Sequence, residues 1–260
     1  MREKIHFAHG NGFPALCYKQ MLDGLEARYD CCYIDKIGHD AYPVTENWHL
    51  LVEELIASVK EKASAPVIAL GHSFGGVLSL VAAIEAPHLF KAVVMIDSPL
   101  LGRFKSSIVR LAKALGVIDR ITPAARTRGR REHWQNKEQV LEYLKTRSLF
   151  KSFTPACLED YINYGLKKTS DGYMLRFDRH TEYLIYRTIP HTLYEYEGRL
   201  ARPAALIYGD KSTVVNPSEI RYMKKHYGIT PLEMKGSHML PMEDPKGVVE
   251  AVFKALDAIL

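Results

Sequence analysis

The segment GHSFGG at 71–76 contains the residues best suited to chemistry. It has Gly-x-Ser-x-Gly spacing and lies between an apolar, strand-like run at 66–73 and a helical run of small residues. A serine at such a strand-to-helix turn exposes its hydroxyl, and a Cβ at Gly71 or Gly75 would clash across the turn. The first amides of the following helix would face the negative charge that develops there. The spacing therefore predicts that Ser73 is the nucleophile of an acyl-transfer reaction.

The chain around this motif alternates between strand and helix patterns. The strand-like runs occupy 4–10, 30–38, 66–73, 90–99, 204–210 and 230–234. The helical patterns occupy 15–29, 47–64 with Asn47 as the expected N-cap, 74–86, 217–227 and 245–259. Apolar strands that alternate with helices indicate an α/β fold, with a mostly parallel sheet covered by helices on both faces.

The alternation stops between residues 100 and 202, where the pattern is helical, irregular and rich in aromatic residues. An insertion of this length between two strands predicts a large helical cap over the edge of the sheet. The predicted core is therefore formed by 1–99 and 203–260, and the cap by 100–202. We expect some of the cap's aromatic side chains to face the site below them.

Composition limits the function classes. The chain has 260 residues, a net charge of +5 and four cysteines without the spacing of a disulfide framework or a metal site. The N-terminal MREKIHFAHG lacks the apolar region of a signal peptide, and no run is long enough to span a membrane. We therefore expect a cytoplasmic protein without stable membrane insertion; its oligomeric state is not indicated.

The basic stretch ARTRGRRE, at 125–132, has two interpretations. It could bind an acidic substrate or an anionic lipid surface, or it could simply be a solvated surface segment. No nucleic-acid recognition motif accompanies these charges, so no nucleic-acid partner is expected.

Three motifs together resemble the α/β-hydrolase family over essentially the whole chain. They are AHGNG at 8–12, GHSFGG, and GSHMLPMEDP at 236–245. The resemblance implies that His238 is the general base and that the backbone N–H groups of Asn11 and Phe74 form the oxyanion hole. The family usually has one or two strands before the HG loop, so this sheet should be shortened at that edge. No cofactor and no metal ion are implied.

The acid that orients the histidine has two candidates. In most of the family it lies three residues after the glycine that ends the penultimate strand, which here is Gly209, so that position holds Ser212. Asp210 is the nearest carboxylate but lies two residues too early. Asp97 ends the apolar strand after the nucleophile helix, and IDSP resembles small bacterial esterases that place the acid there. We favour Asp97, with Asp210 as the alternative acid.

A serine nucleophile excludes the dehalogenase and epoxide-hydrolase chemistry of this family, which needs an aspartate at that position. The favoured function is hydrolysis of a small-molecule carboxylic ester with an apolar acyl or aryl group, through an acyl-enzyme. The same residues also serve thioester or C–C bond hydrolysis. A non-catalytic small-molecule-binding protein of the same fold is the alternative from another class.

Overall fold

A computed structural model of the chain describes residues 2–260, and a six-stranded, wholly parallel sheet forms its centre. In sheet order, the strands are β2 (Asp30–Tyr33), β1 (Lys4–Ala8), β3 (Val67–His72), β4 (Phe90–Ile96), β8 (Ala204–Gly209) and β9 (Thr230–Met234). Within residues 2–260 no strand precedes β1, and β2 forms the edge. The predicted parallel α/β sheet and its shortened edge are therefore confirmed.

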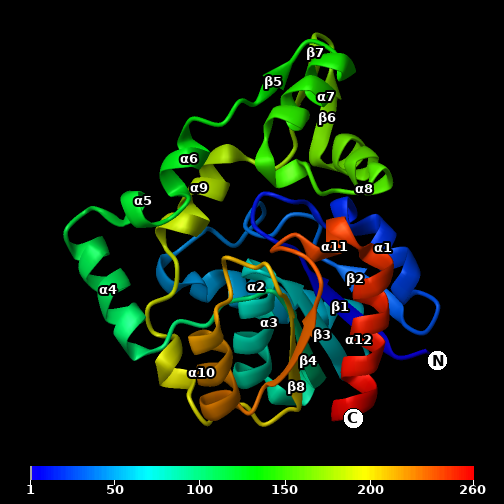
Figure 1. Cartoon of the computed structure of the whole chain (residues 1–260). Coiled ribbons are helices and arrows are strands. Elements are labelled where there is room, and N and C mark those ends of the chain that lie inside the picture. The colour runs from blue at the N-terminus through cyan, green and yellow to red at the C-terminus, as the bar shows by residue number, and fades with distance from the viewer. Residues whose placement is uncertain (1) are drawn as a thin grey trace.

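Helices cover both faces of this sheet (Figure 1). On one face, Ile68 and Leu70 of β3 pack with α1 (Lys19–Leu25) and α12 (Pro245–Ile259). On the other, Val67 and Ala69 pack with three more helices, which are α2 (His49–Lys62), α3 (Phe74–Glu85) and α10 (Pro217–Tyr227). Successive side chains of a strand point to opposite faces, so a strand covered on both sides is apolar throughout. All six residues of β3 are buried.

Two local predictions in the N-terminal half of the chain were inaccurate, one for a helix start and one for a strand end. Asn47 is not a helix N-cap, because it has φ 57° and α2 begins at His49. Its side-chain oxygen instead accepts a hydrogen bond from the backbone N–H of His191, at 2.9 Å. Asparagine tolerates this left-handed conformation better than most residues. The strand expected over 30–38 is also shorter, since β2 ends at Tyr33.

The segment predicted as a helical cap contains helices and also a small sheet. The helices are α4 (Arg103–Ala114), α5 (Ile118–Ile121), α6 (Ala124–Arg128), α7 (Lys137–Thr146), α8 (Pro155–Asp160) and α9 (Arg179–Arg187). The antiparallel sheet has the order β5-β7-β6, with β5 (His133–Trp134), β6 (Leu166–Thr169) and β7 (Gly172–Leu175). These strands have two to four residues, too few to establish an alternating pattern. The boundaries at 99/100 and 202/203 stay a prediction.

Short elements complete the chain. They are α11 (Leu240–Glu243), a π-helical turn at Tyr161–Gly165, and 3-10 turns at Ala15–Tyr18, Glu46–Trp48, Pro87–Leu89, Ser148–Phe150 and Leu193–Tyr196. Across residues 2–260, none of the helices has the length and apolar character needed to cross a membrane.

Candidate active site

Ser73 lies in a tight turn between β3 and α3. Its backbone has φ 53° and ψ −117°, a strained conformation for a residue with a side chain. A Cβ at Gly71 would lie 2.3 Å from the carbonyl oxygen of Gly75, and one at Gly75 would lie 2.1 Å from that of Ala8. The Ser73 N–H donates to the carbonyl of Ile96 at 2.9 Å, which fixes the turn against β4. The close approach at both glycines is therefore the one that the motif predicted.

Asp97 follows β4 directly and is completely buried. Three donors converge on its carboxylate. Oδ2 accepts from His238 Nδ1 at 2.6 Å and from the hydroxyl of Ser212 at 2.6 Å, and Oδ1 accepts from the Gly209 N–H at 3.1 Å. β3 and β4 pair with His72 opposite Ile96, so the nucleophile and this carboxylate follow neighbouring positions of adjacent strands. The structure therefore brings Asp97 and His238 together.

Asp210, the alternative acid, has other partners. Its oxygens accept from Lys235 Nζ at 2.8 Å and from the Gly236 N–H at 3.0 Å. The hydrogen bond from Lys235 lowers the pKa of the Asp210 carboxyl. The hydrogen bonds of this side chain are therefore directed to the turn after β9, and none of those formed within residues 2–260 reaches His238.

Ser212, at the family's usual acid position, supports Asp97. The backbone N–H groups of Val214 and Val215 donate to its Oγ at 3.1 and 3.2 Å. With its oxygen accepting two hydrogen bonds, the hydroxyl hydrogen is directed to Asp97 Oδ2. The sequence indicated that this serine cannot replace a carboxylate, but it did not indicate that the serine donates to one.

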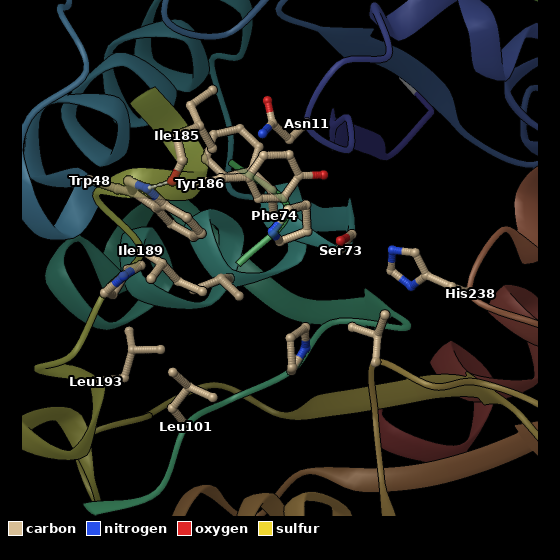
Figure 2. A pocket seen from close by; sticks show the side chains of 15 residues that line it. Asn11, Trp48, Ser73, Phe74, Leu101, Ile185, Tyr186, Ile189, Leu193 and His238 are labelled. Atoms are coloured by element: carbon tan, nitrogen blue, oxygen red, sulfur yellow. Dashed lines mark hydrogen bonds between the residues drawn. The ribbon is translucent and has the colours of Figure 1, made fainter. Parts of the chain in front are cut away.

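Ser73 and His238 line the same cavity, and Figure 2 shows them near one another at one end of it. Among residues 2–260 no hydrogen bond joins the Ser73 hydroxyl to the imidazole. Catalytic hydrogen bonds are often long without substrate and shorten in the Michaelis complex. The arrangement is compatible with proton transfer from Ser73 to His238, and the two catalytic roles stay a prediction.

A buried hydrogen-bond chain holds the backbone of His238. The Gly10 N–H donates to the hydroxyl oxygen of Tyr18 at 3.0 Å, and that hydroxyl lies 2.8 Å from His72 Nδ1. His72 Nε2 in turn lies 2.9 Å from the carbonyl oxygen of His238. Burial, together with the nearby His238, lowers the pKa of His72 to about 3, so its ring is neutral. Tyr18 then donates to Nδ1, and Nε2–H donates to the carbonyl.

Neither His72 nor Tyr18 was singled out from the sequence as a residue of the site. The position of His72 inside the serine motif was the only sequence feature that could have pointed to this hydrogen-bond chain. Tyr18 lies 54 residues away from His72 in sequence, so no local pattern joins the two. These hydrogen bonds connect three loops of the site: the HG loop with Gly10, the turn with Ser73, and the loop with His238.

The predicted oxyanion residues Asn11 and Phe74 also line the cavity. Within residues 2–260, neither backbone N–H donates a hydrogen bond to another group of the protein. The loop of Asn11 is held from α9, because Asn11 Nδ2 donates to the Glu182 carbonyl at 3.0 Å. Glu182 is itself paired with Arg130 at 2.7 Å. Both amides are therefore free to bind a developing oxyanion, and this role stays a prediction.

The cavity has a volume of about 290 Å³ and an almost entirely apolar lining. Its lining residues are Asn11, Trp48, Ser73, Phe74, Val77, Pro99, Leu101, Pro123, Ile185, Tyr186, Ile189, Pro190, Leu193, Val214 and His238. In Figure 2, Trp48, Ile189 and Leu193 lie at the end away from His238. Of the predicted cap aromatics, Tyr186 faces the site, whereas Trp134, Phe150, Phe153 and Tyr161 pack in a hydrophobic core.

Comparisons with known proteins identify the family. The sequence model of the "Alpha/beta hydrolase family" matches residues 7–251. Monoglyceride lipase of Rattus norvegicus is 27% identical over an alignment of 129 positions that covers 46% of this chain and 42% of that protein. The matched part thus covers less than half of that relative's length.

Two solved structures share the fold over nearly the whole chain. E-2-(acetamidomethylene)succinate hydrolase has a TM-score of 0.78 at 18% identity and covers 98% of this chain and 91% of its own. An esterase of M. tuberculosis has a TM-score of 0.72 at 20% identity and covers 98% and 86%. Identities this low show the fold alone, whereas the family model spans most of the sequence. The chain belongs to the alpha/beta hydrolase family.

Proposed function

We propose that this protein hydrolyses carboxylic esters with an apolar acyl or aryl group through a Ser73 acyl-enzyme. One observation carries the proposal. The contact between His238 and the buried Asp97 lies beside a strained serine turn, and both open into an apolar cavity. A purely structural histidine has no need of a buried carboxylate on one nitrogen and a cavity beside its ring.

The positions of these groups support the following reaction. Ser73 Oγ attacks the ester carbonyl while His238 Nε2 accepts its proton, and the carbonyl oxygen becomes an oxyanion held by the amides of Asn11 and Phe74. The C–O bond then breaks, and the departing alkoxide takes the proton back from His238. A water molecule repeats the sequence on the acyl-enzyme and releases the carboxylic acid. Asp97 keeps the proton of the resting imidazole on Nδ1 and stabilises the imidazolium.

The cavity limits the substrate. Small-molecule sites typically have volumes of about 300–1,000 Å³, so this cavity lies at the small end. The end away from His238 is formed by Trp48, Ile189 and Leu193, and the lining contains no Asp, Glu, Lys or Arg. We therefore expect p-nitrophenyl butyrate and hexanoate to be cleaved with higher kcat/KM than the acetate, which leaves the cavity unfilled, and the palmitate, which exceeds it.

Two measurements test the proposal. Fluorophosphonate labelling should modify the wild type and Ser107→Ala, an exposed serine on α4, but not Ser73→Ala. Ser73→Ala should also lose p-nitrophenyl ester turnover while keeping its fold by circular dichroism. Turnover near the wild-type level in purified Ser73→Ala would refute the assignment of the nucleophile.

The same series separates the alternatives. Labelling of Ser73 without turnover of any ester, but with turnover of an acyl thioester, would assign the activity to thioesters. Labelling without turnover of esters or thioesters would direct the search to C–C bonds. Absence of labelling in the folded protein would favour a binding protein of this fold.

A further inference from the structure

The helix α4 exposes a continuous apolar face to solvent. Phe104, Ile108, Leu111 and Leu115 lie on it or directly after it and are 79%, 46%, 59% and 65% exposed. Their spacing of four, three and four residues places them on one stripe of the helix. The opposite stripe is the one that the protein covers, since Val109 and Ala112 are buried with Ile118. In Figure 1, α4 lies at the outer edge of the molecule, away from the sheet.

The segment that contains this helix is strongly basic. Between residues 103 and 131 there are nine Lys and Arg residues and a single acidic residue, Asp119, which gives +8 in a chain of net charge +5. The nine cations are Arg103, Lys105, Arg110, Lys113, Arg120, Arg126, Arg128, Arg130 and Arg131. The rest of the chain is therefore slightly acidic, and four of its carboxylates pair with cations of this segment.

Several of these cations have no acidic partner. Five of the nine form ion pairs with acidic side chains, namely Arg103, Lys105, Lys113, Arg128 and Arg130. The other four are Arg110, Arg120, Arg126 and Arg131, and all of them are exposed. None of the ion pairs found within residues 2–260 includes any of these four. Arg110 belongs to α4 itself, so the helix that exposes the apolar face also carries an unpaired positive charge.

We propose that α4 binds the surface of a membrane that contains anionic phospholipids. An amphipathic helix of this kind lies in the plane of the interface, with its apolar side chains among the acyl chains and its cations at the headgroups. Charge decides between a lipid surface and a second copy of the chain. Two copies packed through α4 would bring the unpaired cations of both copies together, whereas an anionic surface supplies the negative charge that these cations lack.

The proposal has a consequence for access to the cavity. Leu101, just before α4, and Pro123, just after α5, both line the cavity of Ser73. A helix held at the headgroups would therefore place the cavity close to the source of apolar molecules. The binding itself is independent of the proposed ester hydrolysis, because it needs no catalytic residue.

Co-sedimentation of the full-length protein with vesicles tests this proposal. We expect binding to phosphatidylcholine vesicles that contain phosphatidylserine and much weaker binding to phosphatidylcholine alone. Phe104→Ser/Leu111→Ser should abolish binding, while Leu260→Ser, which changes an equally exposed leucine elsewhere, should retain it. Each of Arg110→Gln and Arg120→Gln should weaken binding about fivefold, since one cation near an anionic surface contributes roughly 1 kcal/mol.

The charge control is Lys246→Gln/Lys254→Gln on α12, which should bind as the wild type does. The substitutions of apolar residues and those of charged residues should all leave the circular dichroism spectrum unchanged, because the altered side chains are exposed. Equal binding of the wild type and Phe104→Ser/Leu111→Ser would overturn the proposal. A second result would also overturn it. In that case the wild type does not bind vesicles but forms a dimer in analytical ultracentrifugation, and Phe104→Ser/Leu111→Ser is monomeric.

Discussion

Replacing Asp97 by asparagine removes one charge from the centre of the site and keeps the shape of the side chain. Three donors point at this carboxylate, from His238, Ser212 and Gly209. An amide can accept on one side only, so its NH₂ group must face at least one donor. If the NH₂ group faces Gly209, only the Gly209 N–H is left unpaired, at a cost of about 1–3 kcal/mol. If the NH₂ group faces His238 and Ser212, two donors are left unpaired.

The orientation of the new amide determines the size of the effect. Ser212 cannot turn its hydrogen away easily, because Val214 and Val215 already donate to its oxygen. The amide oxygen of Asp97→Asn therefore stays toward His238, and the imidazole keeps the tautomer with hydrogen on Nδ1. The remaining loss is the attraction between the carboxylate and the imidazolium, which is about 4 kcal/mol for charges roughly 4 Å apart at an effective dielectric constant near 20.

We therefore expect kcat/KM of Asp97→Asn on p-nitrophenyl butyrate to fall about a thousandfold. This is less than the roughly 10⁴-fold loss of a protease variant in which the same substitution forces the wrong tautomer. Asp210→Asn is the matched control and should lose less than about threefold, since its partners are Lys235 and Gly236. A loss below about tenfold in Asp97→Asn, or a larger loss in Asp210→Asn, would refute this reasoning.

A carboxylate restored at the family's usual position should rescue that variant. In the Asp97→Asn background, Ser212→Asp introduces a carboxylate next to residue 97 and beside the amides of Val214 and Val215, which now donate to the Ser212 oxygen. We expect at least a tenfold recovery of kcat/KM. Ser212→Asn in the same background provides no charge and should give none.

Three further predictions concern positioning and stability. His72→Ala should lower kcat about tenfold with little change in KM, and His72→Gln, which can still donate to the His238 carbonyl, should retain more activity. Arg130→Met leaves Glu182 buried without its partner, so urea unfolding at neutral pH should show a loss of about 3–5 kcal/mol, and adding Glu182→Gln should recover most of it. Burial raises the pKa of Glu54 from 4.5 to about 7, so the native state holds a proton that the unfolded chain releases. The free energy of unfolding should therefore fall by about 3 kcal/mol as pH rises from 4.5 to 7, and a wild-type slope equal to that of Glu54→Gln would contradict this.

The sequence predicted those parts of the protein whose physics is local. The alternation of apolar strands and helices identified the parallel sheet, and the glycines on either side of Ser73 identified the strained turn. Asp97 was identified because a charged residue ended an otherwise apolar strand. Its contact with His238 is present in the structure, while its catalytic role awaits the substitutions above.

Features that depend on distant contacts were not predicted. The donation from Ser212 to Asp97 spans 115 residues, and the chain through Tyr18 and His72 joins loops that are far apart in sequence. The cap's sheet was missed because its strands are too short for a pattern. Asn47 was misassigned as an N-cap because asparagine suits two roles: it caps helices, and its side chain can also accept a hydrogen bond from a distant backbone N–H, here that of His191 in the cap.

The position of Asp97 on the central sheet affects how the site responds to heat. Surface loops open locally at a small free energy, whereas central strands open only in global unfolding. The nucleophile and Asp97 follow β3 and β4, which pair in the middle of the sheet, and only Ser212 is contributed by the loop after β8. A site whose carboxylate belonged to that loop would lose it during each local opening. Here the carboxylate should stay in place until the whole domain melts.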